Sequence, residues 1–401
     1  MKTEQINATC GIGSTGKICL GISKILDEEH IENHILFSSQ GNGDPKGISC
    51  SGDRYIKVQA FKSRILGNYG FNSKSATRKM IAELDRIGPG VVHLHNIHGH
   101  DCNLEMLFTY FKKHRTKLVW TFHDCWAFTG YCPHFTMADC YQWKSQCTHC
   151  IQRREYSWFF DKSHQLFERK KRLLAGCNLN IVTPSRWLAD QVKQSFLRAY
   201  PVTVINNGID LNCFRPVKSD FRKRYGLNNQ KIILGVAFDW GARKGLDVFV
   251  DLAGKLSDEY QIVLVGTNDV VDRQLPGNIL SIHRTKNQQE LAEIYSAADL
   301  FVNPTREENY PTVNMEAIAC GTPVLTFRTG GSPEMLDDTC GSVVTCDDVD
   351  ALEREIIRIC SERPYTEAAC TEKARVFDQY ERLKEYLKLY ERIDAAGDQR
   401  N

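Results

Sequence analysis

Two carboxylates separated by seven residues, Glu308 and Glu316, have the clearest chemistry in this sequence. Residues 312–320 predict a short helix, because Pro311 suits a helix start and Gly321 suits a helix end. Glu308 then lies on the entering loop and Glu316 just over one turn inside the helix, so both face one ligand near the helix N-terminus. This end of a helix attracts anions, phosphates above all. Carboxylates beside a phosphate site are suited to bind hydroxyl groups, such as those of a ribose and a sugar.

The segment from Glu308 to Glu316 resembles the Glu-x7-Glu signature of retaining nucleotide-sugar glycosyltransferases of glycosyltransferase family 4. The resemblance continues through residues 330–334, Gly-Gly-Ser-Pro-Glu, which are similar to the family's Gly-Gly-x-Pro-Glu. The alternative is an ordinary helix with two surface glutamates, which a bare Glu-x7-Glu would favour. The family implies the GT-B fold, two Rossmann-like doubly wound α/β domains that face a central cleft. It also implies that Glu316 holds the ribose hydroxyls and Glu308 the donor sugar.

The resemblance further implies how the diphosphate of the donor is held. Lys244 follows a predicted strand and matches the family lysine that neutralises the diphosphate, on which charge builds as it departs. The helix N-terminus near Thr312 and the backbone of Gly330 and Gly331 are expected to act on the same group. A solvated Arg-Lys turn is the alternative for Lys244.

The donor half departs from the family at one position. The family arginine about six residues before the lysine is absent, because Phe238 stands there. We expect Arg243 to supply the missing charge. Thr285, in the turn after a predicted strand, matches the place where this fold brackets the nucleobase.

A glycine-rich loop near the start of the chain allows two interpretations. Residues 11–17, Gly-Ile-Gly-Ser-Thr-Gly-Lys, nearly spell the phosphate-binding loop of a kinase or NTPase. Ile18 argues against that, because the hydroxyl that would hold Mg²⁺ is missing. In the glycosyltransferase interpretation, Gly13 and Gly16 let the backbone approach the ligand. The preceding residues 3–9 lack a strong apolar run, and Thr3 and Glu4 are polar where the first strand of the family is normally apolar, so we expect this strand to be short or weakly held.

Histidines gather at two predicted strand ends. The family carries a histidine after the strand that ends near residue 122, and His123 matches it, which implies that His123 touches a hydroxyl of the donor sugar. A structural hydrogen bond at a strand end is the alternative. A metal interpretation is also open for the preceding group, although its last two members lie in a loop without fixed geometry: His93, His95, His98 and His100.

A cysteine cluster lies within residues 125–150. The spacing Cys-x7-Cys-x6-Cys-x2-Cys suits a tetrahedral structural zinc site, with reduced thiols or disulfides as the alternatives: Cys132, Cys140, Cys147 and Cys150. The insert is polar and we expect it to lack a core of its own, so a metal would stabilise it. Four cysteine ligands leave no open position, so zinc would take no part in the chemistry.

Length and composition bound the remaining possibilities. A chain of 401 residues exceeds what one core usually fills, and alternating short apolar runs and helical patterns predict parallel α/β architecture. We expect an acceptor-side domain over residues 1–200, a donor domain over 201–372, and a final helix over 373–401 that crosses back to the first domain.

A net charge of +2 argues against nucleic acid as a partner. No signal core or membrane span is recognisable, and sixteen cysteines suit a reducing compartment, so we expect the cytoplasm.

Most strands and helices can be assigned from apolar periodicity. The predicted strands are 34–38, 91–95, 118–122, 179–183, 231–236, 261–265, 279–282, 300–303 and 324–327. The predicted helices, besides the one at 312–320, are 16–26, 75–86, 161–175, 245–256, 288–296 and a long final one at 373–393.

The sequence therefore favours a retaining glycosyltransferase that needs no cofactor for catalysis. It would move a sugar from a UDP or GDP donor to a saccharide or lipid-linked acceptor, in work such as bacterial surface polysaccharide synthesis. Two alternatives are a catalytically silent GT-B protein that binds a nucleotide sugar and a P-loop phosphotransferase. A lipid-linked acceptor would imply peripheral contact with the inner membrane face, for which residues 162–172 are a weak candidate.

Overall fold

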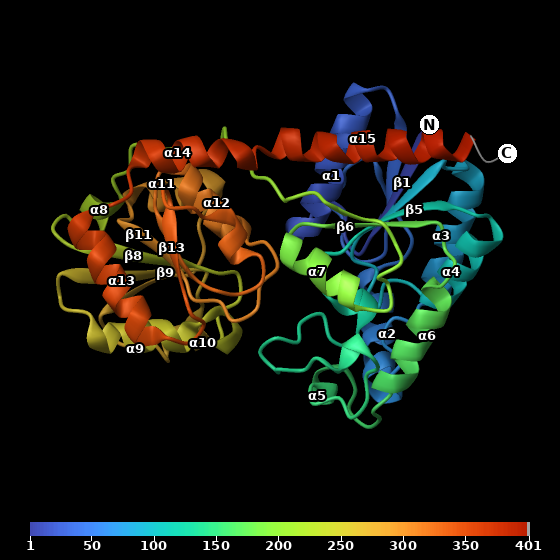
Figure 1. Cartoon of the computed structure of the whole chain (residues 1–401), viewed down its shortest axis with the longest axis horizontal. Coiled ribbons are helices and arrows are strands. Elements are labelled where there is room, and N and C mark those ends of the chain that lie inside the picture. Colours follow the sequence, from blue (N-terminus) through green and yellow to red (C-terminus); the bar gives the residue numbers. More distant parts are fainter. Residues whose placement is uncertain (399–401) are drawn as a thin grey trace. The chain divides into compact units, whose positions relative to one another are not determined.

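The computed structural model describes residues 1–398, with side chains described as far as residue 395. The chain divides into two compact units. The first is formed by Met1–Ile205 together with the residues from Tyr380 on, and the second by Asn206–Gln379. Each unit is one parallel sheet covered by helices on both faces, as Figure 1 shows.

The sheet of the first unit has seven strands in the order β3-β2-β1-β4-β5-β6-β7, and all neighbouring strands are parallel. This is the doubly wound order, in which the chain reverses direction across the sheet between β1 and β4. The strands are β1 (Lys2–Asn7), β2 (Glu32–Phe37), β3 (Gly47–Ser49), β4 (Val91–Leu94), β5 (Lys117–Thr121), β6 (Leu179–Thr183) and β7 (Val202–Val204).

Strand β1 corrects one expectation. It is neither short nor weakly held, but a central strand of six residues that pairs with both β2 and β4. The side chains of Thr3, Glu4, Gln5 and Asn7 are fully buried, and the last three have polar partners on neighbouring segments. Glu4 lies 2.7 Å from Nδ1 of His34, and Oε1 of Gln5 lies 3.1 Å from Nε2 of His95. Apolar content alone therefore underestimated this strand.

Helices cover both faces of the first sheet. Buried side chains of α3, α4 and α6 pack on one face, and those of α1 and the last helix, α15, pack on the other. The helices are α1 (Gly13–Glu28), α2 (Asp53–Leu66), α3 (Lys74–Ile87), α4 (Leu104–Lys113), α5 (Arg153–Tyr156), α6 (Ser163–Leu174), α7 (Arg186–Gln194) and α15 (Gln379–Asp398).

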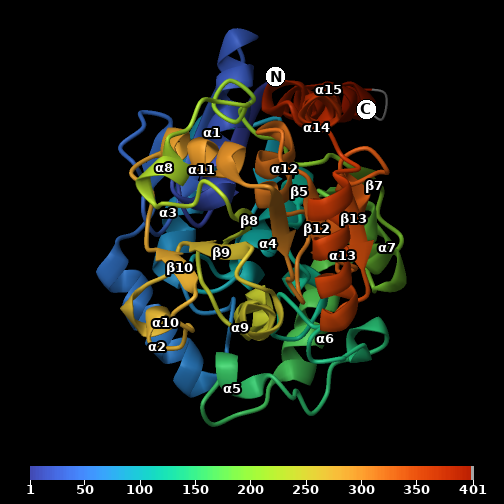
Figure 2. The same ribbon diagram turned by 90° about the vertical axis from the view of Figure 1, so that its left-hand side faces the viewer.

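The second sheet repeats the doubly wound order, β10-β9-β8-β11-β12-β13, again with parallel neighbours. Helices α11 and α12 cover one face and α9 and α13 the other, as Figures 1 and 2 show. The strands are β8 (Lys231–Val236), β9 (Tyr260–Val265), β10 (Ile279–Ile282), β11 (Leu300–Asn303), β12 (Val324–Phe327) and β13 (Gly341–Val344). The helices are α8 (Phe221–Arg224), α9 (Leu246–Lys255), α10 (Asp269–Asp272), α11 (Gln288–Ala297), α12 (Thr312–Ala319), α13 (Val349–Glu362) and α14 (Glu367–Ala374).

The end of the chain corrects a second expectation. The stretch predicted as one long helix is broken: α14 ends at Ala374, a short turn follows, and α15 begins at Gln379. Asp378 between them has an extended backbone, with φ −56° and ψ 118°. The break ends the contribution of the chain to the second unit, and the residues from Tyr380 on belong to the first.

Candidate active site

Lys244 and Glu308 lie together in the second unit. They follow β8 and β11, which are neighbours in the sheet although two strands separate them along the chain. Such a reversal point is where open α/β sheets bind ligands, at the carboxyl ends of the strands. The ammonium of Lys244 forms an ion pair with the carboxylate of Glu308, and each side chain is about one-fifth exposed. A cation and a carboxylate therefore lie side by side at this edge of the sheet.

The Gly330-Gly331 loop packs directly against the backbone of Glu308. Gly330 has φ +52°, and a Cβ atom built there would lie 1.7 Å from the carbonyl oxygen of Glu308. Gly331 donates its N–H to the carbonyl of Asn309 at 2.8 Å. Only glycine permits this approach, so the loop fixes the segment that carries Glu308 just before helix α12.

Glu316 lies inside α12, and its carboxylate accepts a hydrogen bond from the hydroxyl of Tyr295 at 3.0 Å. Burial, and then the negative charge of Glu316, raises the pKa of Tyr295 far above its usual value, so the phenol stays protonated and keeps donating. No sequence pattern pointed to Tyr295, which lies on α11 among apolar neighbours. Thr312 is the first residue of α12, as predicted.

Three further positions of the predicted donor site lie on the loops after β8 and β10. The carbonyl of Arg243 accepts the N–H of Arg306 at 2.9 Å, so its backbone is fixed to the segment that leads to Glu308. Phe238, where the family has arginine, is 98% exposed. Thr285 lies half-buried in the turn between β10 and α11.

In the first unit, the glycine loop does not form a phosphate-binding loop of the NTPase kind. Helix α1 already begins at Gly13, which has φ +68°, so Gly16 and Lys17 lie inside the helix rather than ahead of it. A Cβ atom on Gly16 would lie 2.8 Å from Oγ1 of Thr9 and 3.0 Å from the amide nitrogen of Gly11. The glycine thus lets the loop fold onto the helix, and the P-loop interpretation is wrong.

His123 follows β5 and contacts a buried histidine of the neighbouring strand end. Its Nε2 lies 3.3 Å from Nδ1 of His95, and Nε2 of His95 lies 3.1 Å from Oε1 of Gln5. The amide nitrogen of Gln5 donates to the carbonyl of Cys19, so its oxygen is the acceptor, and His95 donates from Nε2. Burial lowers the pKa of His95 well below its usual value and lowers that of His123 to about 4. Both rings are neutral near pH 7, so His123 donates from Nε2 and its Nδ1 is an acceptor.

The other histidines have structural partners. His93 is fully buried, with Nδ1 2.5 Å from the hydroxyl of Tyr390 on α15 and Nε2 2.8 Å from Oγ1 of Thr121. His98 forms an ion pair of 2.9 Å with Asp124. These contacts connect the ends of β4 and β5, and the structure does not assemble this group of histidines around a metal position within the described residues.

The cysteine insert has no core of its own, as expected. Its fully buried aromatic side chains belong to the core of the first unit: Trp126, Phe128, Tyr131, Phe135 and Trp143. Among the residues that the structure describes, no three of the four cluster thiols lie within 4.8 Å of one another. Cys132 is nevertheless near the other three, because burial raises the pKa of its thiol and their charges raise it further. All four are free thiols, and the amide of Gly130 lies 3.2 Å from Sγ of Cys147. Zinc binding stays a prediction that would require the thiols to move together.

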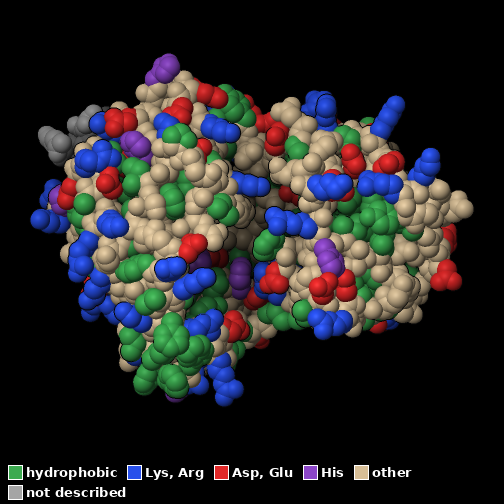
Figure 3. Space-filling model, turned by 180° about the vertical axis from the view of Figure 1, so that it is seen from behind, with side chains coloured by type: hydrophobic (Ala, Val, Ile, Leu, Met, Phe, Trp, Pro, Cys, Tyr) green, Lys and Arg blue, Asp and Glu red, His purple; other side chains and the backbone are tan. Residues whose placement is uncertain are grey.

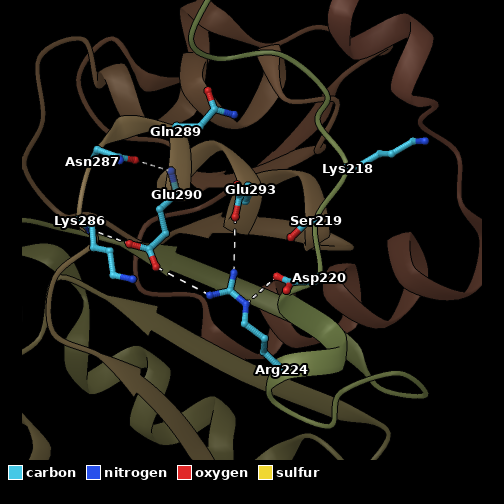
Figure 4. A pocket seen from close by; sticks show the side chains of 9 residues that line it. All are labelled: Lys218, Ser219, Asp220, Arg224, Lys286, Asn287, Gln289, Glu290 and Glu293. Atoms are coloured by element: carbon cyan, nitrogen blue, oxygen red, sulfur yellow. Dashed lines mark hydrogen bonds and ion pairs between the residues drawn. The ribbon is translucent and has the colours of Figure 1, made fainter.

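A pocket of about 660 Å³ lies elsewhere on the second unit (Figure 4). Arg224 at its centre pairs with Asp220 at 2.6 Å and with Glu293 at 3.5 Å. None of the predicted donor residues lines it. The pocket therefore lies outside the candidate site.

Two family models match most of the chain. "Glycosyltransferase Family 4" matches residues 19–212 and "Glycosyl transferases group 1" matches residues 230–362. A curated relative, the putative colanic acid biosynthesis glycosyl transferase WcaC of Escherichia coli, is 25% identical over 98% of this chain and 100% of its own length. Sucrose-phosphate synthase from Thermosynechococcus elongatus has a TM-score of 0.70 at 18% identity, covering 98% of this chain and 99% of that one. Anabaena HepE, solved with UDP-glucose, has a TM-score of 0.65 at 15% identity over 97% and 99%.

The two doubly wound sheets and these likenesses define the class of protein, a glycosyltransferase with the GT-B fold. Within that class, the chain belongs to the glycosyltransferases of family 4.

Proposed function

We propose that the protein transfers a sugar from a nucleotide diphosphate donor to an acceptor hydroxyl with retention of configuration. The observation that carries the proposal is the ion pair of Lys244 with Glu308 at the reversal point of the second sheet. Such a pair supplies one group for each end of the bond that breaks. The ammonium contacts the diphosphate, and the carboxylate accepts a hydrogen bond from a hydroxyl of the donor sugar. Glu316, oriented by Tyr295, holds the ribose hydroxyls.

The bond between the anomeric carbon and the phosphate oxygen breaks, and a bond from that carbon to the acceptor oxygen forms on the same face. The acceptor proton passes to the departing phosphate oxygen, so no side chain has to act as nucleophile. Lys244, the N-terminus of α12 and the backbone of Gly330 and Gly331 stabilise the charge that builds on the diphosphate. His123 orients the sugar by accepting a hydrogen bond from one of its hydroxyl groups at Nδ1. No metal is needed in these steps.

The donor base and the pathway are proposed from the relatives. HepE was solved with UDP-glucose, and the name of WcaC refers to colanic acid biosynthesis. We infer a UDP or GDP sugar as donor and a saccharide or lipid-linked acceptor, used in bacterial polysaccharide or lipopolysaccharide synthesis at the cytoplasmic side of the membrane.

A thermal-shift panel of UDP, GDP, ADP and ATP at millimolar concentration tests the donor class. A ligand at about 100 times its Kd adds about 2.7 kcal/mol of stability and raises Tm. A rise with UDP or GDP alone supports the proposal and identifies the base, whereas a rise only with ATP and Mg²⁺ contradicts it.

Turnover is then measured as release of UDP or GDP from sugar donors, for the wild type and for Glu308→Ala. Loss of release in a variant that still gains stability from the nucleotide supports catalysis. Equal release by both proteins would contradict the role of Glu308, and nucleotide binding without release by the wild type would favour the catalytically silent alternative.

A further inference from the structure

An exposed apolar surface lies on the first unit, where α2 approaches the segment after α5. Six large side chains that are 42–63% exposed form what we name the aromatic patch: Val58, Phe61, Leu66, Trp158, Phe159 and Phe160. Figure 3 shows hydrophobic side chains gathered at the lower left, with Lys and Arg side chains next to them. An exposed group of this size on a folded protein usually marks an interaction surface.

The fold holds the aromatic patch in place. The rings of Phe61 and Trp158 meet edge to face with centroids 5.8 Å apart, and the amide of Trp158 donates to the carbonyl of Arg64 at 2.8 Å. Phe159 and Phe160 contact each other at 6.4 Å, and the ammonium of Lys162 lies 5.6 Å from the ring of Phe160. These side chains therefore present a preformed surface rather than a loose tail.

Positive charge surrounds the aromatic patch. Residues 53–66 and 151–162 carry seven Lys or Arg and three Asp or Glu, a surplus of four positive charges, against +2 for the whole chain. Within the described part of the chain, no ion pair involves Lys57, Lys62, Arg64 or Arg154, all of which are exposed. These cations are available to an external anion.

We propose that the aromatic patch docks onto the surface of a bilayer that contains anionic lipid. Trp and Phe side chains favour the boundary between headgroups and acyl chains, and neighbouring Lys and Arg favour anionic headgroups. A protein partner would also use aromatic residues, but the unpaired cations that surround these rings match an extended anionic surface. No helix within residues 1–398 is long and apolar enough to cross a bilayer, so the contact would be peripheral.

This surface replaces the candidate suggested by the sequence. Residues 162–172 fall mainly in α6, whose apolar side chains, among them Leu166 and Phe167, are buried in the core. Even Lys170 of that helix is fully buried, with its ammonium 2.6 Å from the carbonyl of Trp126. Helix α6 therefore cannot lay an apolar face on a membrane, whereas α2 and the segment after α5 can.

The experiment is co-sedimentation of the full-length protein with vesicles of phosphatidylcholine alone or with about one-third phosphatidylglycerol. One variant is Phe159→Ser with Phe160→Ser, and another is Lys57→Gln with Lys62→Gln. Matched controls change exposed residues of the second unit, Ile357→Ser and Lys223→Gln. Each protein is first shown to keep its Tm, so that lost binding is not unfolding.

The expected result is binding to the anionic vesicles that weakens at high salt, because salt screens exposed charges. The double phenylalanine variant is expected to bind at least roughly tenfold more weakly, since it removes two apolar anchors. The lysine variant should lose roughly fivefold for each cation removed, and both controls should bind like the wild type.

Three results would overturn the proposal: no binding to anionic vesicles, equal binding to both vesicle types, or full binding by the double phenylalanine variant. A concentration-dependent dimer that this variant abolishes would assign the surface to a second copy instead. Vesicle binding measures no sugar transfer, so this inference stands or falls independently of the proposed reaction.

Discussion

His95 holds His123 through a contact of 3.3 Å between Nδ1 of the first ring and Nε2 of the second. His95 is itself held by Gln5 of the central strand, so three polar residues on neighbouring strand ends fix one ring orientation. His123 consequently has a defined tautomer in which Nδ1 accepts. His95 is thus a positioning residue for the proposed sugar contact.

Replacing His95 by leucine removes the acceptor that fixes His123. Turnover is expected to fall roughly tenfold to a hundredfold, since a misoriented group near the reacting atoms costs about that much. Binding of UDP or GDP should not change, because the donor residues lie in the second unit. The double variant with His123→Ala should be no slower than His123→Ala alone, and additive losses in the two variants would contradict a positioning role.

Lys244→Met removes the cation of the candidate site and leaves Glu308 without this partner. We expect turnover to fall by about 10²- to 10³-fold, as for other groups that stabilise charge in the transition state, and nucleotide affinity to fall as well. Glu308→Gln should reduce turnover with little change in nucleotide affinity, because its proposed contact is the sugar. Lys255→Met, a lysine on α9 that pairs with Asp350, is the matched control. Unchanged kinetics in Lys244→Met would remove that residue from the site.

Tyr295→Phe deletes one hydroxyl that donates to Glu316. A hydrogen bond to a charged group contributes about 1.5–3 kcal/mol, so the variant should bind the nucleotide about tenfold more weakly. Isothermal titration with UDP and with free uracil distinguishes the ribose contact from contacts with the base. Only the ligand that has a ribose should bind more weakly to the variant. Equal affinity of wild type and variant for UDP would show that Tyr295 does not act through the ribose contact.

Acid should destabilise the first unit through its buried neutral histidines. The pKa of His123 is about 4 in the folded protein because of burial, against about 6.5 in an unfolded chain. Between these values the unfolded state binds more protons, so stability falls as pH is lowered through this window. Through His123 alone, the free energy of unfolding falls by about 2 kcal/mol between pH 7 and pH 5.

Thermal melts of the wild type and His123→Asn at the two pH values measure this contribution. The fall in Tm from pH 7 to pH 5 should be smaller in the variant. Glu4, whose pKa burial raises to about 7, acts in the opposite direction, but equally in both proteins. Equal falls in Tm would contradict the neutral state of His123.

Zinc at the cysteine insert is tested by the metal content of the purified protein. If Cys132, Cys140, Cys147 and Cys150 bind zinc, one equivalent is expected, and Cys147→Ser with Cys150→Ser should lose it. Cys177→Ser in the same unit is the control. A protein without zinc that keeps its Tm in a chelator would instead assign the stability of the insert to its aromatic side chains, which are buried in the core of the first unit.

Several strands could be predicted from the sequence alone. Apolar runs such as residues 179–183 and 231–236 match β6 and β8 to the residue, because buried parallel strands are continuously apolar. Strand β1 was underestimated because its buried Glu4 and Gln5 find partners far away in the sequence, His34 and His95, which no local pattern records. The same reason hid Tyr295, whose partner lies 21 residues away. The aromatic patch joins residues nearly 100 positions apart, so only the folded chain brings them together.

The return of α15 makes the first unit discontinuous in the sequence. Its core includes Leu383, Tyr386 and Tyr390, which lie beyond the entire second unit. During synthesis the second unit can therefore complete its core while the first still lacks a covering helix. A fragment that ends at Ile205 would leave the residues Ile22 and Val119 exposed to water, so expressing the first half alone would yield a protein prone to aggregate rather than an isolated domain.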